Sequence, residues 1–159
     1  MVDKKQLKLS IITRSSSLID VIDRLKEIDL DTNLDDGTAL NYAVNYQKED
    51  IVKYLLENGV NPNSAQKSGL TPLMSAIEAE NMTLINLLLQ YNADVTLRHK
   101  KGADALFKAI HQDNIEIIKL LLQHGANPYL EYKNYTNYQA VIDMNRDKNI
   151  LTLFENYKN

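Results

Sequence analysis

The side chains in this sequence that are best suited to acid–base or metal chemistry are its three histidines, His99, His111 and His124. A protein-bound zinc ion needs three or four ligands arranged around one point, and no further ligands accompany these histidines at a suitable spacing. His99 and His111 are expected to face solvent on the same side of the fold. His124 is expected to cap the carbonyl groups at a helix end, where a cationic side chain is favourable. The sequence therefore predicts no bound metal.

Nucleophilic and carboxylic groups also lack the partners that catalysis requires. A run of serines at 15–17 has no base at a spacing that could activate a hydroxyl, and we expect it to form a turn and helix cap. Asp35 and Asp36 are adjacent carboxylates that we expect on a solvated turn, whereas glycoside hydrolysis needs a cleft. The chain has no glycine-rich phosphate loop, no Gly-x-Ser-x-Gly and no His-Glu-x-x-His. We therefore predict a protein that is not an enzyme and needs no cofactor.

The composition narrows the class of protein further. A length of 159 residues, with 44% hydrophobic and 25% charged residues, is typical of one soluble globular domain. The net charge of -3 and the pI of about 5.6 argue against a protein that mainly binds nucleic acid. The absence of cysteine excludes disulfides and fits a reducing compartment. The N-terminus lacks the apolar core of a signal peptide, and the apolar run at 84–89 is too short to span a bilayer. We expect a cytoplasmic protein that does not bind membranes.

A repeat of 33 residues organises the chain and would position all of these side chains. Three segments align without a gap, and each is followed by an apolar block: the segments are 36–43, 69–76 and 102–109, and the blocks are 51–56, 84–89 and 117–122. Each apolar block predicts a helix with its apolar face turned inward. Such a repeat is the signature of a stacked architecture rather than of a folded enzyme core.

Each column of the repeat has a physical role. Side-chain oxygens that can cap a helix start recur at Thr38, Thr71 and Asp104. Small residues that let neighbouring helices approach recur at Ala43, Ala76 and Ala109. Residues that tolerate the left-handed conformation at a helix end recur at Gly59, Asn92 and Gly125. Each unit is therefore expected to be a helix, a short turn, a second helix and a loop with a projecting turn.

These segments resemble the ankyrin repeat, whose signature reads Gly-x-Thr-Pro-Leu-His-x-Ala and later Ile-Val-x-Leu-Leu-Leu-x-x-Gly-Ala. Residues 69–76 match it most closely. The signature histidine is replaced in every unit, by Asn41, Met74 and Phe107. Three motifs in strict register make the resemblance specific.

The period extends to both ends of the chain. Leu18 and Ile150 lie 33 residues before Ile51 and after Ile117, and Asn137 falls in the capping column. Leu7 and Ile11 likewise lie 33 residues before Leu40 and Val44. Polar residues, Asp23 and Glu155, replace leucine in the outermost units, as expected of repeats with one face open to water. We predict one all-α domain, an ankyrin-repeat solenoid of five stacked units with degenerate end caps, at about residues 1–34, 35–67, 68–100, 101–133 and 134–159.

The resemblance implies a concave binding face, built from the tips of the projecting turns and the exposed side of the first helix in each unit. The turn tips are expected to present Leu34, Asp35, Lys67, Ser68, Leu70, Lys100, Lys101, Ala103, Lys133, Asn134 and Thr136. The first helices are expected to present Tyr42, Asn45, Tyr46, Ser75, Glu78, Ala79, Lys108, His111 and Gln112.

Charge and tyrosine content vary along this face. Seven acidic residues stand between 20 and 36, whereas later turn tips carry lysines. This pattern suggests an acidic end and a basic middle that orient a partner of opposite charge, unless the lysines serve solubility alone. Four tyrosines recur at every third position, at Tyr129, Tyr132, Tyr135 and Tyr138. Tyrosine is enriched in binding hot spots, and we expect one or two of the four, Tyr129 and Tyr138 first, to be in the core and the others, Tyr135 among them, to be exposed.

The function that these features favour is binding of another protein by a monomer. The alternative is a regulatory or inhibitory subunit that neutralises or scaffolds an enzyme. An unrecognised enzyme, which would lose activity on changing His111 or Glu78, is less favoured. Lysines mixed with tyrosines could also bind nucleic acid, but the acidic total and the acidic first unit disfavour it.

Overall fold

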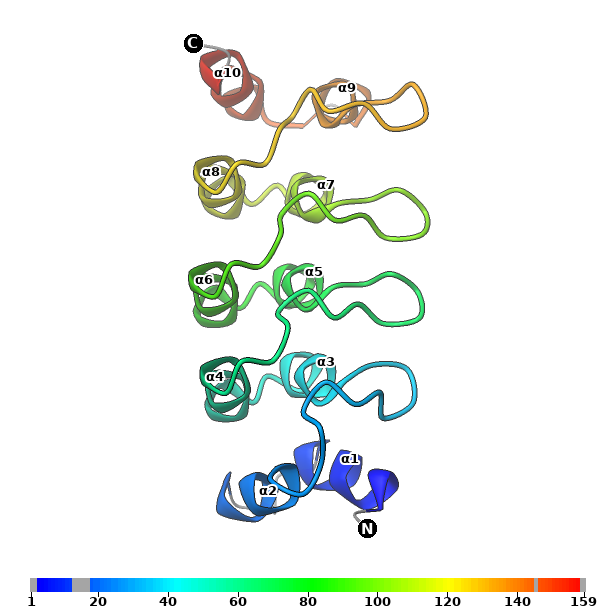
Figure 1. The fold of residues 1–159 in the computed structure, drawn as a ribbon. Coiled ribbons are helices and arrows are strands. Elements are labelled where there is room, and N and C mark those ends of the chain that lie inside the picture. Colours follow the sequence, from blue (N-terminus) through cyan, green and yellow to red (C-terminus); the bar gives the residue numbers. More distant parts are fainter. Residues whose placement is uncertain (1–2, 13–17, 145, 158–159) are drawn as a thin grey trace. The chain divides into compact units, whose positions relative to one another are not determined.

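A computed structural model describes residues 3–12, 18–144 and 146–157 of the chain, so the serine run at 15–17 lies outside the described residues. The described residues form helices joined by loops (Figure 1), and outside the helices they pair only in isolated β-bridges at Arg98–Asp104 and Tyr132–Tyr135. The helices are α1 (Lys4–Ile12), α2 (Leu18–Leu25), α3 (Ala39–Asn45), α4 (Glu49–Glu57), α5 (Pro72–Glu78), α6 (Met82–Gln90), α7 (Ala105–His111), α8 (Ile115–Gln123), α9 (Asn137–Asp143) and α10 (Lys148–Tyr157). The predicted all-α class is confirmed.

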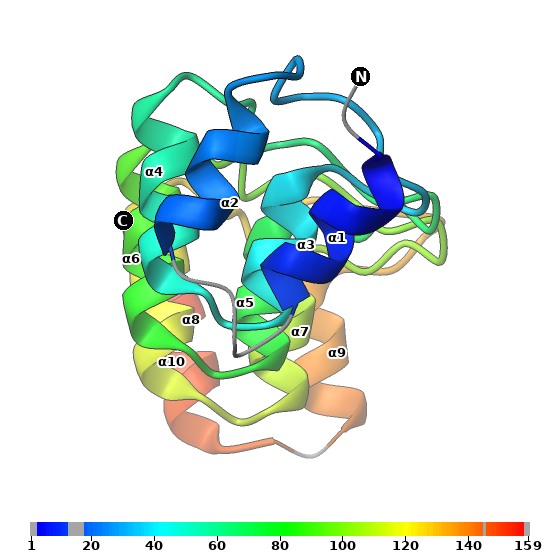
Figure 2. The same ribbon diagram turned by 90° about the horizontal axis from the view of Figure 1, so that it is seen from below.

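The chain divides into two compact parts, residues 1–94 and 95–159. In the N-terminal part, α1, α3 and α5 pack on one another in one layer, and α2, α4 and α6 pack in a second layer (Figure 2). In the C-terminal part, α7 packs on α9 and α8 packs on α10. Consecutive helices also pair across the layers, as α3 does with α4 and α7 with α8. Each part is therefore a stack of helix pairs.

The core of each part is made of the predicted apolar columns. The alanines that were expected to allow close helix approach, Ala43, Ala76 and Ala109, have no exposed surface. Leu7 and Ile11 of α1 are likewise fully buried, as the extension of the period to the N-terminus predicted. Burial of these aliphatic side chains is the main force that stabilises the stack, because each fully buried side chain contributes about 1.5–3 kcal/mol.

In all three repeats that match best, the first helix begins directly after the predicted capping residue, which is Thr38, Thr71 or Asp104. The Thr71 hydroxyl oxygen accepts a hydrogen bond from the N–H of Met74 at 3.2 Å, and an Asp104 carboxylate oxygen accepts one from the N–H of Phe107 at 2.8 Å. At Thr38 the side chain of Asn41 closes the helix start instead, because its carbonyl oxygen accepts from the N–H of Thr38 at 2.8 Å.

The prediction that Asn137 caps α9 is wrong. The cap is Thr136, whose hydroxyl oxygen accepts from the N–H of Gln139 at 3.1 Å, so α9 begins 32 residues after α7 rather than 33. Asn137 is buried and donates to both carboxylate oxygens of Asp104 at 3.0 Å. Asn137 is therefore the first residue of α9 rather than its cap, and α10 again begins 33 residues after α8, with Ile150 buried as Ile117 is.

Helix ends follow the sequence more closely. Gly59, Asn92 and Gly125 all have the predicted left-handed backbone, with φ of 81°, 62° and 89°. Asp23 and Glu155, which replace leucine in the outermost units, are both exposed. Among the described helices, none is both long and apolar enough to cross a bilayer.

Candidate binding surface

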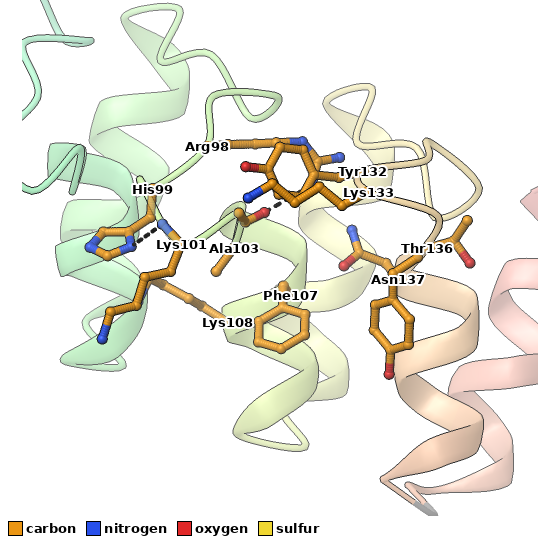
Figure 3. Close-up of a pocket in the computed structure, with 12 residues that line it drawn as sticks. Arg98, His99, Lys101, Ala103, Phe107, Lys108, Tyr132, Lys133, Thr136 and Asn137 are labelled. Carbon is orange, nitrogen blue, oxygen red and sulfur yellow. Dashed lines mark hydrogen bonds between the residues drawn. The ribbon is translucent and has the colours of Figure 1, made fainter.

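A pocket of about 510 Å³ opens on the C-terminal part, between two projecting turns and α7 (Figure 3). One turn spans residues 98–104 and the other spans residues 132–136. The lining residues are Arg98, His99, Lys101, Gly102, Ala103, Phe107, Lys108, Tyr132, Lys133, Tyr135, Thr136 and Asn137. Residues that the sequence placed on the binding face, among them Lys101, Lys108, Lys133 and Tyr135, therefore line one pocket although they come from three separate segments.

Arg98 holds the two turns together at the wall of the pocket. Its guanidinium donates to the carbonyl of Gly102 at 3.0 Å and to that of Leu130 at 3.4 Å. It also pairs with the Asp104 carboxylate at 3.3 Å, where both side chains are largely buried. Asp104 in turn accepts from Asn137. Sequence reasoning missed Arg98, because its contact with Leu130 of the next turn forms only when successive repeats stack.

Tyr132 closes the same wall. Its ring lies 5.0 Å from the Arg98 guanidinium carbon and 5.2 Å from the Lys133 ammonium nitrogen, both measured to the ring centroid. The ring also packs directly on Gly102, whose φ is 96°. A β-carbon at Gly102 would lie 2.6 Å from ring carbon Cδ1 of Tyr132, so glycine is required there both by the backbone angle and by this contact. Figure 3 shows Arg98, Tyr132 and Lys133 together at the top of the pocket.

Phe107 presents an apolar ring to the pocket. The residue at the same position of the repeat in the N-terminal part is Asn41, which can form a side-chain hydrogen bond that phenylalanine cannot. Asn41, at the same column, is buried and donates to the carbonyl of Ser64 at 2.8 Å. The carbonyl that corresponds to Ser64 in the C-terminal part is that of Leu130, and it accepts from Arg98 instead. The ring of Phe107 is half-buried and lines the pocket. In the view of Figure 3, Lys101 and Lys108 lie on one side of it.

The electrostatic character of the pocket is cationic. Its lining residues include arginine, lysines and a histidine, and none of them is aspartate or glutamate. His99 accepts a hydrogen bond at Nδ1 from the N–H of Lys101 at 3.2 Å, so the neutral ring carries its proton on Nε2. The hydroxyl of Tyr135 donates to Asp143 at 3.0 Å, and burial together with that carboxylate raises the pKa of Tyr135. Tyr135 therefore remains a neutral donor at physiological pH.

Lys133 and Asn134 form the tip of the second turn. Both have left-handed backbones, with φ of 51° and 63°, and the N–H groups and carbonyls of Tyr132 and Tyr135 pair across them at 2.9 and 3.1 Å. Two left-handed central residues match the twist of a tight hairpin. This geometry points Lys133 and Asn134 away from the core, and both are exposed as predicted.

Predicted residues of the N-terminal part lie on α3, α5 and the turns that precede them. Asn45, Tyr46 and Glu78 are exposed, as is Lys67, and Tyr46 keeps half of its surface in water at 50%. Ser68 and Leu70 are half-buried. These residues are therefore positioned for contact, and the surface they would form remains a prediction.

Two residues of that part were predicted to be exposed but are buried. Leu34 retains only 6% of its surface, because the turn bond from its N–H to the carbonyl of Gly37 at 2.9 Å turns the side chain inward. Ser75 retains 7%, since it lies on the buried side of α5. Neither side chain is available to a partner in this structure.

Lys8 is a residue of this surface that sequence reasoning missed. Its ammonium nitrogen lies 4.8 Å from the ring centroid of Tyr42 and 3.1 Å from the Asp35 carboxylate. Tyr42 and Asp35 raise the pKa of Lys8. Two predicted binding residues are therefore already joined by a cation from α1, and no repeat motif marks that position.

The remaining candidates are distributed as follows. Lys100 and His111 are exposed, Gln112 is half-buried at the end of α7, and the His111 carbonyl accepts from Arg146 at 2.8 Å. His124 is exposed at the end of α8. Tyr129 and Tyr138 pack with ring centroids 5.3 Å apart, but both residues are half-buried, so the prediction that they lie in the core is wrong. No group of three or more histidine, aspartate or glutamate side chains that could hold a metal occurs among the described residues.

Comparison with known families agrees with the helix pairs and the column contacts. The family model described as ankyrin repeats in three copies matches residues 9–99 and, in a second match, residues 80–159. No curated protein matches the sequence. Because the matched segments cover nearly the whole chain and each part is a stack of helix pairs, the chain belongs to the ankyrin-repeat family.

Proposed function

We propose that the chain binds a partner protein through the tips of its projecting turns and the exposed sides of the first helices of its repeats. Ankyrin repeats are in general protein–protein interaction modules. The observation that carries the proposal for this chain is that Lys101, Lys108, Lys133 and Tyr135 line one pocket in the C-terminal part. A pocket that gathers charged and aromatic side chains from separate turns has the features of an interface centre.

The rigidity of the pocket supports the same proposal. Arg98, Asp104 and Asn137 link the two turns by an ion pair and hydrogen bonds that are largely withdrawn from water. A surface that is ordered before binding loses less conformational entropy when a partner arrives. The turns are therefore suited to present fixed side chains rather than to fold around a ligand.

The N-terminal part contributes a second region to the proposed surface. Tyr46 is exposed on α3, and a large amphipathic ring contributes contact area at a low entropic cost. Tyr42 is held by Lys8, and Glu78 lies exposed on α5. This region carries both signs of charge, unlike the cationic pocket of the C-terminal part.

The proposal includes a cytoplasmic monomer that has no turnover of its own and does not bind nucleic acid. The acidic net charge of -3 and the absence of cysteine support these features. If the partner is an enzyme, the chain would act as its inhibitor or scaffold, and the activity of that enzyme would change when the chain is added.

The experiment is affinity capture of the partner from the native organism, followed by measurement of its Kd for variants of the chain. Tyr46→Ala, Lys67→Glu and Lys100→Glu change exposed residues of the proposed surface outside the pocket, and Lys101→Glu and Lys133→Glu change the pocket itself. Lys119→Glu, on the exposed side of α8, is the matched control. We expect at least one surface variant to weaken binding about tenfold or more while the control does not. If every surface variant binds as the unaltered chain does, the proposed surface is wrong.

A further inference from the structure

We propose that the pocket of the C-terminal part binds an acidic peptide segment of the partner, with an apolar side chain seated on Phe107 and flanking carboxylates bound by Lys101 and Lys133. This inference rests on the proposed function and adds the chemistry of the bound segment. The pocket volume of about 510 Å³ lies in the range of about 300–1,000 Å³ that is usual for ligand sites, which leaves room for a few side chains.

Charge complementarity identifies the bound segment as acidic. Lys101 and Lys133 are exposed at the two turns that border the pocket, and the lining contains no aspartate or glutamate. Two carboxylates bond to lining residues: that of Asp104 is paired with Arg98 and bonded to Asn137, and that of Asp143 accepts from the Tyr135 hydroxyl. A carboxylate that enters between the lysines therefore meets attraction and no opposing acidic side chain in the lining.

The acidic net charge of the chain favours an acidic peptide segment over a nucleic acid as the ligand. Arginine can offer a planar fork for two parallel hydrogen bonds to a carboxylate or a phosphate. The fork of Arg98 is occupied by the carbonyls of Gly102 and Leu130 and by Asp104. The cations that border the opening are lysines, which act as point charges, and the net charge of the chain is -3.

Phe107 gives the site its apolar component. Its ring is half-buried, so it presents an apolar surface toward the pocket without being part of the closed core. Ala103 and Gly102 add further apolar lining. A purely acidic peptide would leave this surface in contact with water, whereas a peptide with an apolar side chain between acidic ones would cover it.

The test is selection of binding peptides from a random peptide library displayed on phage, with the full chain as the target. We expect the selected peptides to be rich in aspartate and glutamate around one apolar residue. The double variant Lys101→Glu with Lys133→Glu should weaken their binding by about tenfold or more, because like charges then face each other. The control is Lys119→Glu with Lys148→Glu, which makes the same change in charge at exposed positions on α8 and α10, and it should bind as the unaltered chain does.

A second variant separates the role of the ring from a loss of fold. Phe107→Asn introduces at this column the residue that bonds to a carbonyl in the N-terminal part, so the helix is expected to persist. Circular dichroism should be unchanged, and the preference of the selected peptides for an apolar residue should disappear while the acidic preference remains.

The inference is overturned if no acidic peptides are selected, or if the pocket variant and its control bind them equally. It is also overturned in favour of nucleic acid if labelled oligouridylate binds more tightly than the peptides and loses affinity in the pocket variant. If the acidic-peptide inference fails but Tyr46→Ala or Lys100→Glu still weakens binding of the captured partner, the proposed function stands and only the inference about the pocket is wrong.

Discussion

The ring of Tyr132 occupies the space that any side chain at residue 102 would need. Gly102 combines that contact with a left-handed φ of 96°, whereas Gly125 has a similar φ of 89° with no atom within 4 Å of its would-be β-carbon. Alanine substitutions at the two glycines therefore separate the free-energy cost of the left-handed backbone angle from that of the contact with Tyr132. In the sequence they look alike, since both stand in a loop of the repeat.

We expect Gly102→Ala to lower the free energy of unfolding more than Gly125→Ala. The control carries only the strain of a left-handed alanine, about 1 kcal/mol, while Gly102→Ala must also displace the Tyr132 ring, for about 1–3 kcal/mol more. Urea unfolding followed by circular dichroism measures both. In a Tyr132→Ala background the two substitutions should cost nearly the same amount, and a persistent difference would contradict the assigned contact.

At the scale of elements, a side-chain hydrogen bond joins α10 to the loop between α8 and α9. The hydroxyl of Tyr129 donates to the carbonyl of Phe154 at 2.9 Å, and its ring packs on Tyr138. Burial raises the pKa of Tyr129, with smaller contributions from Tyr138 and Glu155. The bond therefore links the ionisation of one tyrosine to the attachment of the last helix.

We expect the stability of the chain to fall as the pH rises above the ordinary tyrosine pKa of 10.0. The folded chain retains the proton of Tyr129 to a higher pH than the unfolded chain does, so the stabilisation is complete below pH 10.0 and is lost as the pH rises through the raised pKa. Urea midpoints at neutral pH and at about pH 11 measure the fall.

The variant Tyr129→Phe is the matched control for this effect. It should be less stable than the unaltered chain by about 1 kcal/mol at neutral pH, because the hydrogen bond is lost. Its alkaline loss of stability should be smaller, with Tyr135 still contributing, since the pKa of that residue is also raised. An equal alkaline loss in both proteins would show that Tyr129 is not a source of the effect.

The helices were largely predictable from the sequence, but the residue at which α9 begins was not. The helix starts at Thr71 and Asp104 and the helix ends at Gly59 and Gly125 follow from residue type and spacing. The shift of α9 was not foreseen, because threonine and asparagine both cap helices well. In the structure Thr136 caps α9, and Asn137 instead bonds to Asp104 of the preceding repeat.

At the scale of the whole molecule, the chain is two compact parts, each of which is a stack in which helices contact near neighbours along the chain. Stability in such a stack is a sum of contributions within repeats and between adjacent repeats. The C-terminal part depends on α10, whose Phe154 has no exposed surface. Loss of packing there is expected to reach the helices that α10 contacts, α8 and α9.

We expect Phe154→Ala to lower the free energy of unfolding by about 3–5 kcal/mol, because it leaves a cavity in the core. Glu155→Ala changes the next residue, which is exposed, and should stay within about 0.5 kcal/mol of the unaltered chain. Hydrogen exchange should show protection falling together in α8, α9 and α10 of the Phe154 variant. Loss confined to α10 would indicate that this helix is not coupled to its neighbours.

The sequence by itself determined the repeat, the helices and the buried columns, because the period of 33 places the same residue type at the same depth each time. The tertiary structure decided which surface residues are available. It buried Leu34, joined Asp35 to Tyr42 through Lys8, and brought Lys101, Lys108 and Lys133 around Phe107. The physical reason is that burial of an apolar column depends on local periodicity, whereas a pocket depends on side chains that meet only when separate turns stack.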